Sequence, residues 1–318
     1  MCPDITFNEE TCVNTLQTDF LSNKKNKACL ISMVSNFLKM GGVNVDQAQD
    51  DADELIVSTA LRLHQLNKKV VILATDTDIL TILIARAPTD NNILVLHPAT
   101  NKTTAQVFVV DDIQKNIGVM KEAVLFAHAV SGCDKTSALY NKGKKSSYNL
   151  LQKSKSLREK VCRIFNKPNQ RKNEVVAVGE EFVRALYPDG QEFSNINQLR
   201  HHLYNRMMVK QSAASLMDLS NLPPTKAATK QHSLRVYVQV QEWLGNSYPP
   251  TEWGWKLIQD QLFSIPTTLP FAPESLLRLI HCQCNSNCDG RCSCWNSGQK
   301  CSILCATCKG EICTNTDI

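Results

Sequence analysis

The sequence predicts an α/β fold, in which a parallel sheet with flanking helices is followed by a helical region and a small metal-binding tail. Three observations predict it. Helical patterns alternate with short, apolar strands in the first half of the chain. The 318 residues are 43% hydrophobic and 20% charged, enough for about two globular domains of ~150 residues each. Nine of the fourteen cysteines lie between Cys282 and Cys313, which sets the tail apart.

Local patterns place the elements of the first half in order. The predicted helices carry apolar residues at helical spacing and lie at residues 28–40, 53–66 and 121–130. Gly41 and Gly42 favour the end of the first helix. The predicted strands are apolar runs at residues 70–74, 92–96 and 106–110. Because these strands have no polar face, the pattern favours a parallel sheet covered by helices on both faces.

The second half is predicted to be mostly helical. Polar helical signals run from Asp134 to about Met217, and residues 232–244 are predicted to form one more helix. A connector punctuated by prolines then leads to the cysteine tail. The expected division is a partial α/β domain with a helix–hairpin element at 1–160, a helical region at 161–248, a connector at 249–281 and a cysteine tail at 282–318.

Five aspartates are predicted to meet at one edge of the sheet. Asp76 and Asp78 directly follow the strand at 70–74, at its carboxyl end, where open α/β sheets bind their ligands. Asp51 and Asp53 begin the helix expected to pack behind that strand, so they can reach the same edge. Asp134 follows the helix at 121–130 in a glycine turn and is a fifth candidate.

Clustered carboxylates with no obvious cationic partner suggest a hard divalent cation. Mg²⁺ or Mn²⁺ takes oxygen ligands and relieves the repulsion between the acids. Two such ions about 4 Å apart can hold the attacking and leaving oxygens of a phosphodiester, so the pattern indicates metal-assisted phosphodiester hydrolysis. The alternative is that Asp51 and Asp53 cap a helix and that Asp76 and Asp78 end a strand.

The segments DADELIVSTAL, VVILATDTDIL and FAHAVSGCDKTSALYNKGKK resemble the flap-endonuclease branch of the PIN-like nucleases over roughly residues 25–160. The resemblance implies a PIN-like fold and a Mg²⁺-dependent, structure-specific nuclease. It also implies that Asp51, Asp53, Asp76, Asp78 and Asp134 bind metal. Gly143 and Lys145 match the end of the family's hairpin that grips a phosphate backbone. Similar chains are expected among transposon-associated animal proteins.

The chain departs from this family in two respects. The family's first strand and two further acids lie upstream of the matched region, so we expect an amino-terminally truncated, catalytically incomplete site. In the hairpin, Ala138 and Asn141 stand where the family has glycines, and Lys142 stands where it has an apolar residue. These changes weaken the backbone grip and add charge. A phosphate-binding P-loop is rejected, because Lys145 occupies the position that requires Ser or Thr.

A basic segment follows the hairpin. Between Lys142 and Lys172 there are eleven Lys and Arg and one acid, a local charge of +10 within a total of +5. Such a segment can neutralise phosphates without sequence preference, and Tyr148 and Phe165 are interleaved with the cations. The residues expected to contact nucleic acid, with DNA favoured, are Lys142, Gly143, Lys144, Lys145, Lys153 and Lys155. The alternative is a solvated helix face.

The cysteine tail is predicted to bind zinc. Its nine thiolates, six terminal and three bridging, supply the twelve bonds that about three tetrahedral Zn²⁺ ions require. The spacing C-x-C-x3-C-x3-C-x-C-x6-C-x3-C-x2-C-x4-C resembles the CXC module of tesmin-type chromatin proteins, which implies DNA contact with Arg291 in the position of a groove-inserting tyrosine. Disulfides and metal storage are the alternatives. The expected ligands are Cys282, Cys284, Cys288, Cys292, Cys294, Cys301, Cys305, Cys308 and Cys313.

These features predict an intracellular protein, nuclear rather than cytoplasmic, that binds nucleic acid and descends from a metal-dependent nuclease. No apolar run is long enough for a membrane span, and the first twenty residues lack a signal-peptide pattern. The alternative function is a non-catalytic zinc-cluster module that binds chromatin or protein. His128 is expected to be a packing residue and His232 a surface residue, whereas Trp253 is expected to pin the connector to the body.

Overall fold

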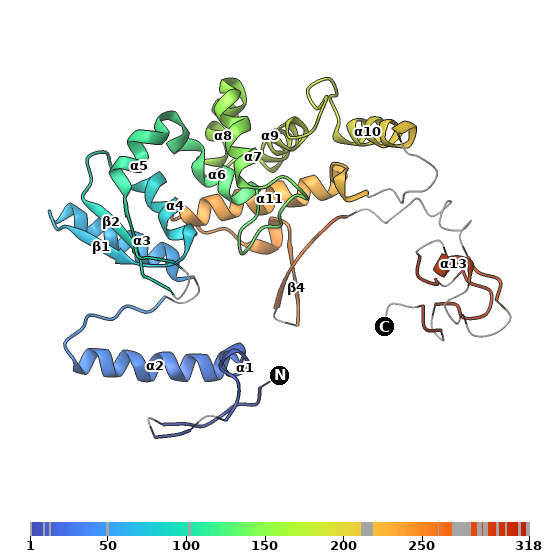
Figure 1. The fold of residues 1–318 in the computed structure, drawn as a ribbon. Helices are drawn as coiled ribbons and strands as arrows, with labels where there is room; N and C mark the ends of the chain where they lie inside the picture. The colour runs from blue at the N-terminus through green and yellow to red at the C-terminus, as the bar shows by residue number, and fades with distance from the viewer. Residues whose placement is uncertain are drawn as a thin grey trace.

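The computed structural model is a mixed α/β protein (Figure 1). It describes residues 2–8, 10–12, 14–48, 51–100, 103–210, 219–259, 261–268, 281–284, 288, 292–296, 299–302, 304–310 and 313–315. The strands are β1 (Val70–Leu73), β2 (Ile93–His97), β3 (Gln106–Val109), β4 (Trp255–Ile258) and β5 (Gln261–Ser264). The helices of the first half are α1 (Gln17–Ser22), α2 (Lys24–Met40), α3 (Ala52–Gln65), α4 (Thr77–Arg86), α5 (Val110–Ile117) and α6 (Val124–Val130), and the 3-10 helix η1 (Gly118–Ala123).

Helices form most of the second half. They are α7 (Lys144–Lys153), α8 (Lys155–Phe165), α9 (Lys172–Ala185), α10 (Ile196–Lys210), α11 (Lys226–Trp243) and α13 (Ser293–Asn296), with the short 3-10 helices η2 (Leu219–Asn221) and η3 (Pro250–Glu252). No helix among the described residues is long and apolar enough to cross a lipid bilayer.

The first sheet has the order β1-β2-β3 and is only partly parallel. Strand β1 pairs with β2 in parallel, but β2 pairs with β3 antiparallel. The expectation of an all-parallel sheet was therefore wrong. The physical reason is the connection between β2 and β3, residues 98–105, which is too short for the crossover of about a dozen residues that a parallel pair requires.

One face of this sheet is covered by helices. Val70 and Ile72 of β1 and Ile93 and Val95 of β2 are buried, α3 packs against β1, and α4 packs on α3 in the same hydrophobic core. Helix α4 was not predicted from the sequence: its segment TDILTILIAR is apolar nearly all round and shows no amphipathic period.

The other face is open, which contradicts the expected covering on both faces. Val71, Leu94 and Val109 lie side by side across the three strands, and Leu73, Leu96 and Val107 form a second row on the same face. Val71, Leu73, Val107 and Val109 are exposed, whereas the two leucines of β2 are half-buried. The strands are as apolar as predicted, but in the described part of the chain no helix covers this face.

The helical body shares its hydrophobic core with the sheet. Helix α11 packs against α6 and α9 and runs through the centre (Figure 1). At the crossing of α9 and α11, Gly179 approaches Ser233 so closely that a Cβ atom would overlap its hydroxyl. The ring of Phe126 packs between Phe165 and Phe182, at centroid distances of 4.5 and 4.8 Å.

Two expectations about the second half need correction. Helix α11 begins at Lys226, six residues before the predicted start, and it is buried along most of its length. His232 is therefore buried and not on the surface, with its Nε2 3.0 Å from the carbonyl of Val130. The connector also contains a hairpin, β4–β5, that was not predicted. Trp253 is buried and stacks on Tyr237 at 4.8 Å, as expected of a residue that pins the connector.

Candidate functional site

Two of the five aspartates cap neighbouring helices. The Asp51 carboxylate accepts a hydrogen bond from the Asp53 backbone N–H (3.1 Å) and caps α3. Asp76 accepts one from the Asp78 N–H (2.8 Å) and caps α4. The expected helix cap is therefore present at Asp51, whereas Asp76, expected to end a strand, also caps a helix. Each of these hydrogen bonds uses one carboxylate oxygen. The second oxygen of Asp76 remains open to another ligand, whereas that of Asp51 faces the Lys135 ammonium at 3.5 Å.

The structure brings the five aspartates together around Asp53. The pKa of Asp53 is raised to about 6, mainly by partial burial. The negative charges of Asp51, Asp76, Asp78 and Asp134 raise it further. These four acids come from three separate segments of the chain. Their shared effect on one carboxyl group means that all four lie within electrostatic range of Asp53.

The five acids do not form a tight ligand cage. Among the described residues, no three carboxylates place oxygens within 4.8 Å of one another. The cluster also has cationic partners that the sequence pattern did not suggest. The Lys135 ammonium lies 3.5 Å from Asp51 and 2.9 Å from Glu242. Asp53, Asp76 and Asp134 form no ion pair within the described part of the chain, so these three carry the uncompensated charge.

His128 links the acid cluster to α7 and was missed as a site residue. Its Nε2 lies 2.6 Å from Asp78, and this hydrogen bond is the main cause that lowers the pKa of the Asp78 carboxyl. The Lys144 ammonium donates to His128 Nδ1 (3.1 Å) and to the Gly132 carbonyl (3.0 Å). A ring that accepts at Nδ1 carries its proton on Nε2 and donates it to Asp78. A lone histidine in the apolar helix VLFAHAV was the one sequence signal for this role.

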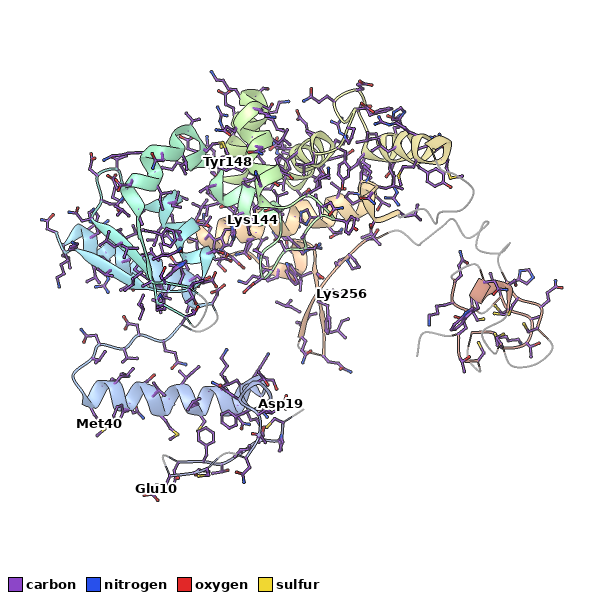
Figure 2. All side chains as sticks on the ribbon, viewed as in Figure 1. Glu10, Asp19, Met40, Lys144, Tyr148 and Lys256 are labelled. Carbon is purple, nitrogen blue, oxygen red and sulfur yellow. The ribbon has the colours of Figure 1, made fainter. Side chains whose placement is uncertain are left out.

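Lys144, which was expected to contact nucleic acid, is exposed at the start of α7, where Figure 2 labels it. Its ammonium donates to His128 Nδ1 and to the Gly132 carbonyl. Lys142 is half-buried, with its ammonium 4.9 Å from the centre of the Tyr187 ring.

The loop between α6 and α7 has the conformation that close backbone approach requires. Asn141, expected to weaken the loop because it replaces a glycine, adopts φ +54°, which asparagine tolerates better than most residues. Gly132 has φ +104°, and a Cβ atom there would touch Ala138 at 2.9 Å. Gly143 begins α7 beside open space, with nothing within 4 Å of a built Cβ. A group from outside can therefore approach its backbone.

Five cations of the basic segment are exposed and form no ion pair within the described part of the chain. They are Lys145, Lys153, Arg163, Lys167 and Arg171. In contrast, Lys155, Lys160 and Lys172 pair with Glu159, Glu181 and Glu252. Phe165 is fully buried in the core, so the suggestion that it is available beside the cations was wrong.

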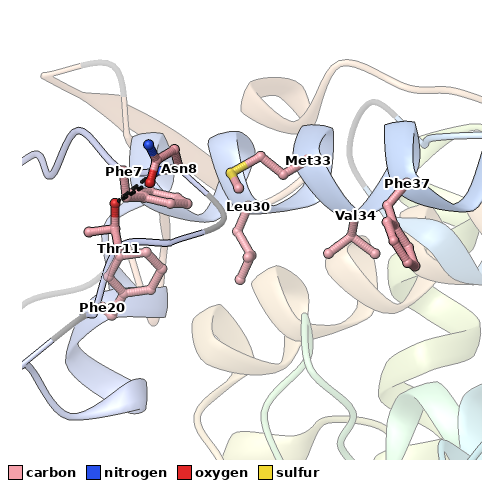
Figure 3. A pocket seen from close by; sticks show the side chains of 8 residues that line it. All are labelled: Phe7, Asn8, Thr11, Phe20, Leu30, Met33, Val34 and Phe37. Carbon is pink, nitrogen blue, oxygen red and sulfur yellow. Dashed lines mark hydrogen bonds between the residues drawn. The ribbon is translucent and has the colours of Figure 1, made fainter.

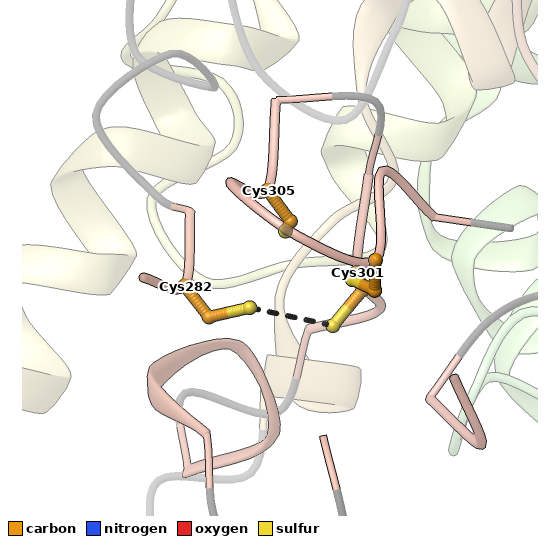
Figure 4. A group of neighbouring side chains, drawn as sticks. Cys282, Cys301 and Cys305 are labelled. Carbon is orange, nitrogen blue, oxygen red and sulfur yellow. Dashed lines mark hydrogen bonds between the residues drawn. The ribbon is translucent and has the colours of Figure 1, made fainter. Parts of the chain in front are cut away.

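The nine tail cysteines form a compact group with the spacing of metal ligands, and Figure 4 shows three of them, Cys282, Cys301 and Cys305. Four sulfur pairs lie at 3.4 Å (Cys282–Cys288), 3.6 Å (Cys294–Cys305), 3.8 Å (Cys292–Cys301) and 4.0 Å (Cys282–Cys301). A Zn–S bond of about 2.3 Å gives a tetrahedral edge of about 3.8 Å, whereas a disulfide requires about 2.05 Å. None of the nine cysteines is in a disulfide. The tail can therefore hold a metal ion, whereas Arg291 lies outside the described residues.

The pKa values of the tail thiols are shifted in different directions. Burial raises the pKa of Cys282 to about 12 and also raises that of Cys301. The backbone N–H of Trp295 donates to Cys292 at 3.4 Å and lowers the pKa of that thiol. A metal ion binds thiolates, so its binding would release protons from the buried thiols.

Comparison with protein-family models, with curated proteins and with solved structures gave no match. The functional argument therefore depends on the geometry of the residues described above.

Proposed function

We propose that the chain binds nucleic acid at a divalent-cation centre formed by the five aspartates, and that it derives from a PIN-like, flap-endonuclease-like nuclease. One observation supports this most: acids from three segments surround Asp53 beyond the end of β1. Repulsion among these carboxylates destabilises the fold, and the packing of the core does not explain why they are clustered. A bound Mg²⁺ or Mn²⁺ would offset that repulsion.

The adjoining basic helix favours a phosphate-bearing partner. Helix α7 begins at the acid cluster, where Lys144 is bonded through His128 to Asp78. The open backbone of Gly143 and the exposed side chain of Lys145 are next to this point. A nucleic-acid backbone that follows α7 would therefore bring a phosphate to the acids. An acidic partner whose negative charges do not follow the cations of α7 would be repelled by the aspartates.

The chain's own residues would divide the work at such a centre. Asp53, Asp76 and Asp134 would supply metal oxygens, because they are the three not engaged by a lysine or histidine. Asp78 would be held in place by the Nε2–H of His128, and Lys135 would fix Asp51. When bound, Mg²⁺ would lower the pKa of a water molecule and stabilise charge on a phosphodiester.

Binding and cleavage are tested on the same branched DNA. We expect Mg²⁺-dependent binding that weakens with salt, and any cleavage should be lost in Asp76→Ala. Lys145→Gln should weaken binding and reduce its salt dependence by about one phosphate contact, because each neutralised phosphate releases counterions. Lys160→Gln is the matched control, since Glu181 already neutralises this lysine at 2.7 Å. If both variants bind like the unmodified chain, the nucleic-acid proposal is wrong.

For the tail we propose a cluster of about three zinc ions of the tesmin-type kind. One ion takes Cys282, Cys292, Cys294 and Cys301, and a second takes Cys288, Cys301, Cys308 and Cys313, because each set lies within 4.8 Å. Cys284 and Cys305 remain for the third ion. Cys282 and Cys308 complete it, because their sulfurs group with that of Cys305. This makes Cys282, Cys301 and Cys308 the bridging thiolates, and the twelve bonds are satisfied.

The second candidate function is a non-catalytic zinc-cluster module that binds chromatin or protein, with the sheet as a scaffold. The compact cysteine group favours it, since the tail is the better-formed ligand set of the two. In that case, Mg²⁺ would have no effect on DNA binding, and removal of zinc would abolish partner binding. Under the nuclease-derived proposal, nucleic-acid binding would depend on Mg²⁺ more than on zinc.

A further inference from the structure

The open face of the first sheet is an apolar surface that takes no part in the candidate site. Its exposed members include Leu73, Val107 and Val71, with exposed fractions of 68%, 59% and 56%. Directly opposite residues pair across the strands, so these side chains and the leucines of β2 form two continuous apolar rows. Strands with no polar face are stable in water when both faces are covered.

Helix α2 has an apolar stripe that is also incompletely covered. Leu30, Val34, Phe37 and Leu38 recur at helical spacing, and Phe37 is 69% exposed. The amino-terminal segment covers this stripe only in part. Phe7 and Phe20 lie against one end of it, and together with the stripe they line an open apolar cavity of about 560 Å³ (Figure 3).

The two surfaces match in size. From Leu30 to Leu38 the stripe rises about 12 Å at 1.5 Å per residue. Strands of four to five residues are about 13–17 Å long, and three strands span about 10 Å, the width of one helix.

The chain between the surfaces is also long enough. Eleven residues, 41–51, connect α2 to α3, and fully extended they reach about 36–40 Å. Strand β1 is at the edge of the sheet, so this connection can pass around it to the open face. In the structure α2 lies away from that face (Figure 1).

We propose that α2 is a strap that closes over the open face of the β1-β2-β3 sheet, with its stripe packed on the rows of Val71 and Leu73. The occupant is the chain's own α2. A short tether gives a local concentration in the millimolar range, which favours this helix over one from a second molecule. Closure buries the stripe and the rows together and removes the cavity beside Phe7.

Photo-crosslinking in the full chain tests the closure directly. A benzoylphenylalanine at position 37 should crosslink to residues 71, 73, 94 or 96 within a single chain. The same group at position 36 should not, because Asn36 lies on the opposite side of α2. A mixture of ¹⁴N- and ¹⁵N-labelled chains separates the occupants. Crosslinks between chains would assign the face to a second copy and overturn the proposal, as would crosslinks confined to residues outside the sheet.

A stability measurement covers the case in which the crosslinking variant does not fold. Phe37→Asp should lower the folding equilibrium constant at least 10-fold if the ring is packed on the sheet, and Leu73→Asp should do the same. Asn36→Asp, the matched control, should change it less than 3-fold. If Phe37→Asp is as mild as its control, the ring stays in solvent and the strap does not close.

Discussion

Replacement of Asp53 by asparagine should stabilise the protein, although it removes a candidate metal ligand. Burial and four neighbouring acids raise the pKa of Asp53 from 3.8 to about 6, so ionisation of this carboxyl works against folding at neutral pH. Two pH units correspond to at most about 3 kcal/mol. Because Asp53 is partly exposed, solvent screening reduces this to about 2 kcal/mol. Its charge in the first turn of α3 is worth about 0.5 kcal/mol in the other direction.

The net expectation is a gain of about 1–2 kcal/mol at pH 7.5 in the absence of divalent ions. The gain should fall to about 0.5 kcal/mol or less near pH 4, because the carboxyl of the unmodified protein is then protonated in the folded state and close to its ordinary pKa of 3.8 in the unfolded state. Urea unfolding in EDTA at pH 7.5 and pH 4 measures both values, with exposed Asp46→Asn as the control. In saturating Mg²⁺ the order should reverse, since only the intact cluster binds the ion. A loss of stability at pH 7.5 without Mg²⁺ would refute the electrostatic account of the cluster.

Three further expectations concern other parts of the chain. Cys301→Ser should lose more zinc by elemental analysis than Cys313→Ser, because Cys301 lies in three of the four-cysteine sets and Cys313 in one; equal losses would contradict the bridging assignment. Gly179→Ala should destabilise the fold by about 1–3 kcal/mol through overlap with Ser233, and a second change, Ser233→Gly, should restore most of the loss in a urea titration. Burial lowers the pKa of His232 from 6.5 to about 4, so its contribution to stability is complete above about pH 6.5 and is lost as the pH falls toward 4. Unfolding of a His232→Gln variant should lack this slope of up to about 3 kcal/mol.

Local patterns in the sequence were sufficient for most elements of the first half. The strand predicted at 70–74 is β1, and the helix predicted at 53–66 is α3, each within a residue or two. The start of α3 was predictable because Asp51 is a capping residue followed by an amphipathic helical sequence, whereas α4, capped by Asp76, lacks that amphipathic pattern. The direction of β3 could have been predicted as well, since its short connection excludes a crossover.

The errors arose where tertiary packing overrides pattern. Helix α11 carries His232, Arg235, Gln239 and Gln241, and such polar residues predict a surface helix, yet all four are buried between neighbouring helices. Three of them, His232, Arg235 and Gln241, form specific contacts, such as the Gln241 amide that donates to the Phe165 carbonyl at 2.6 Å. No sequence period encodes those partners.

The acidic residues of the candidate site could be predicted from the sequence, but its basic residues, His128 and Lys135, could not. Asp53 and the other aspartates follow from helix starts and strand ends, which have fixed positions in an α/β unit. The contacts of His128 and Lys135 with them depend on how α6 and α11 pack on α3 and α4. That packing is a property of the folded core and has no signature in residue spacing.

The central claim, that aspartates from three segments share one divalent ion, is tested most directly by Mn²⁺ binding followed by water-proton relaxation. We expect a site in the unmodified chain whose affinity falls at least 10-fold in Asp134→Asn, because this residue joins the cluster from a distant loop. Asp112→Asn, an exposed acid in α5, should leave the affinity unchanged. Equal Mn²⁺ affinity in the unmodified chain and Asp134→Asn would show that the aspartates do not act as one site.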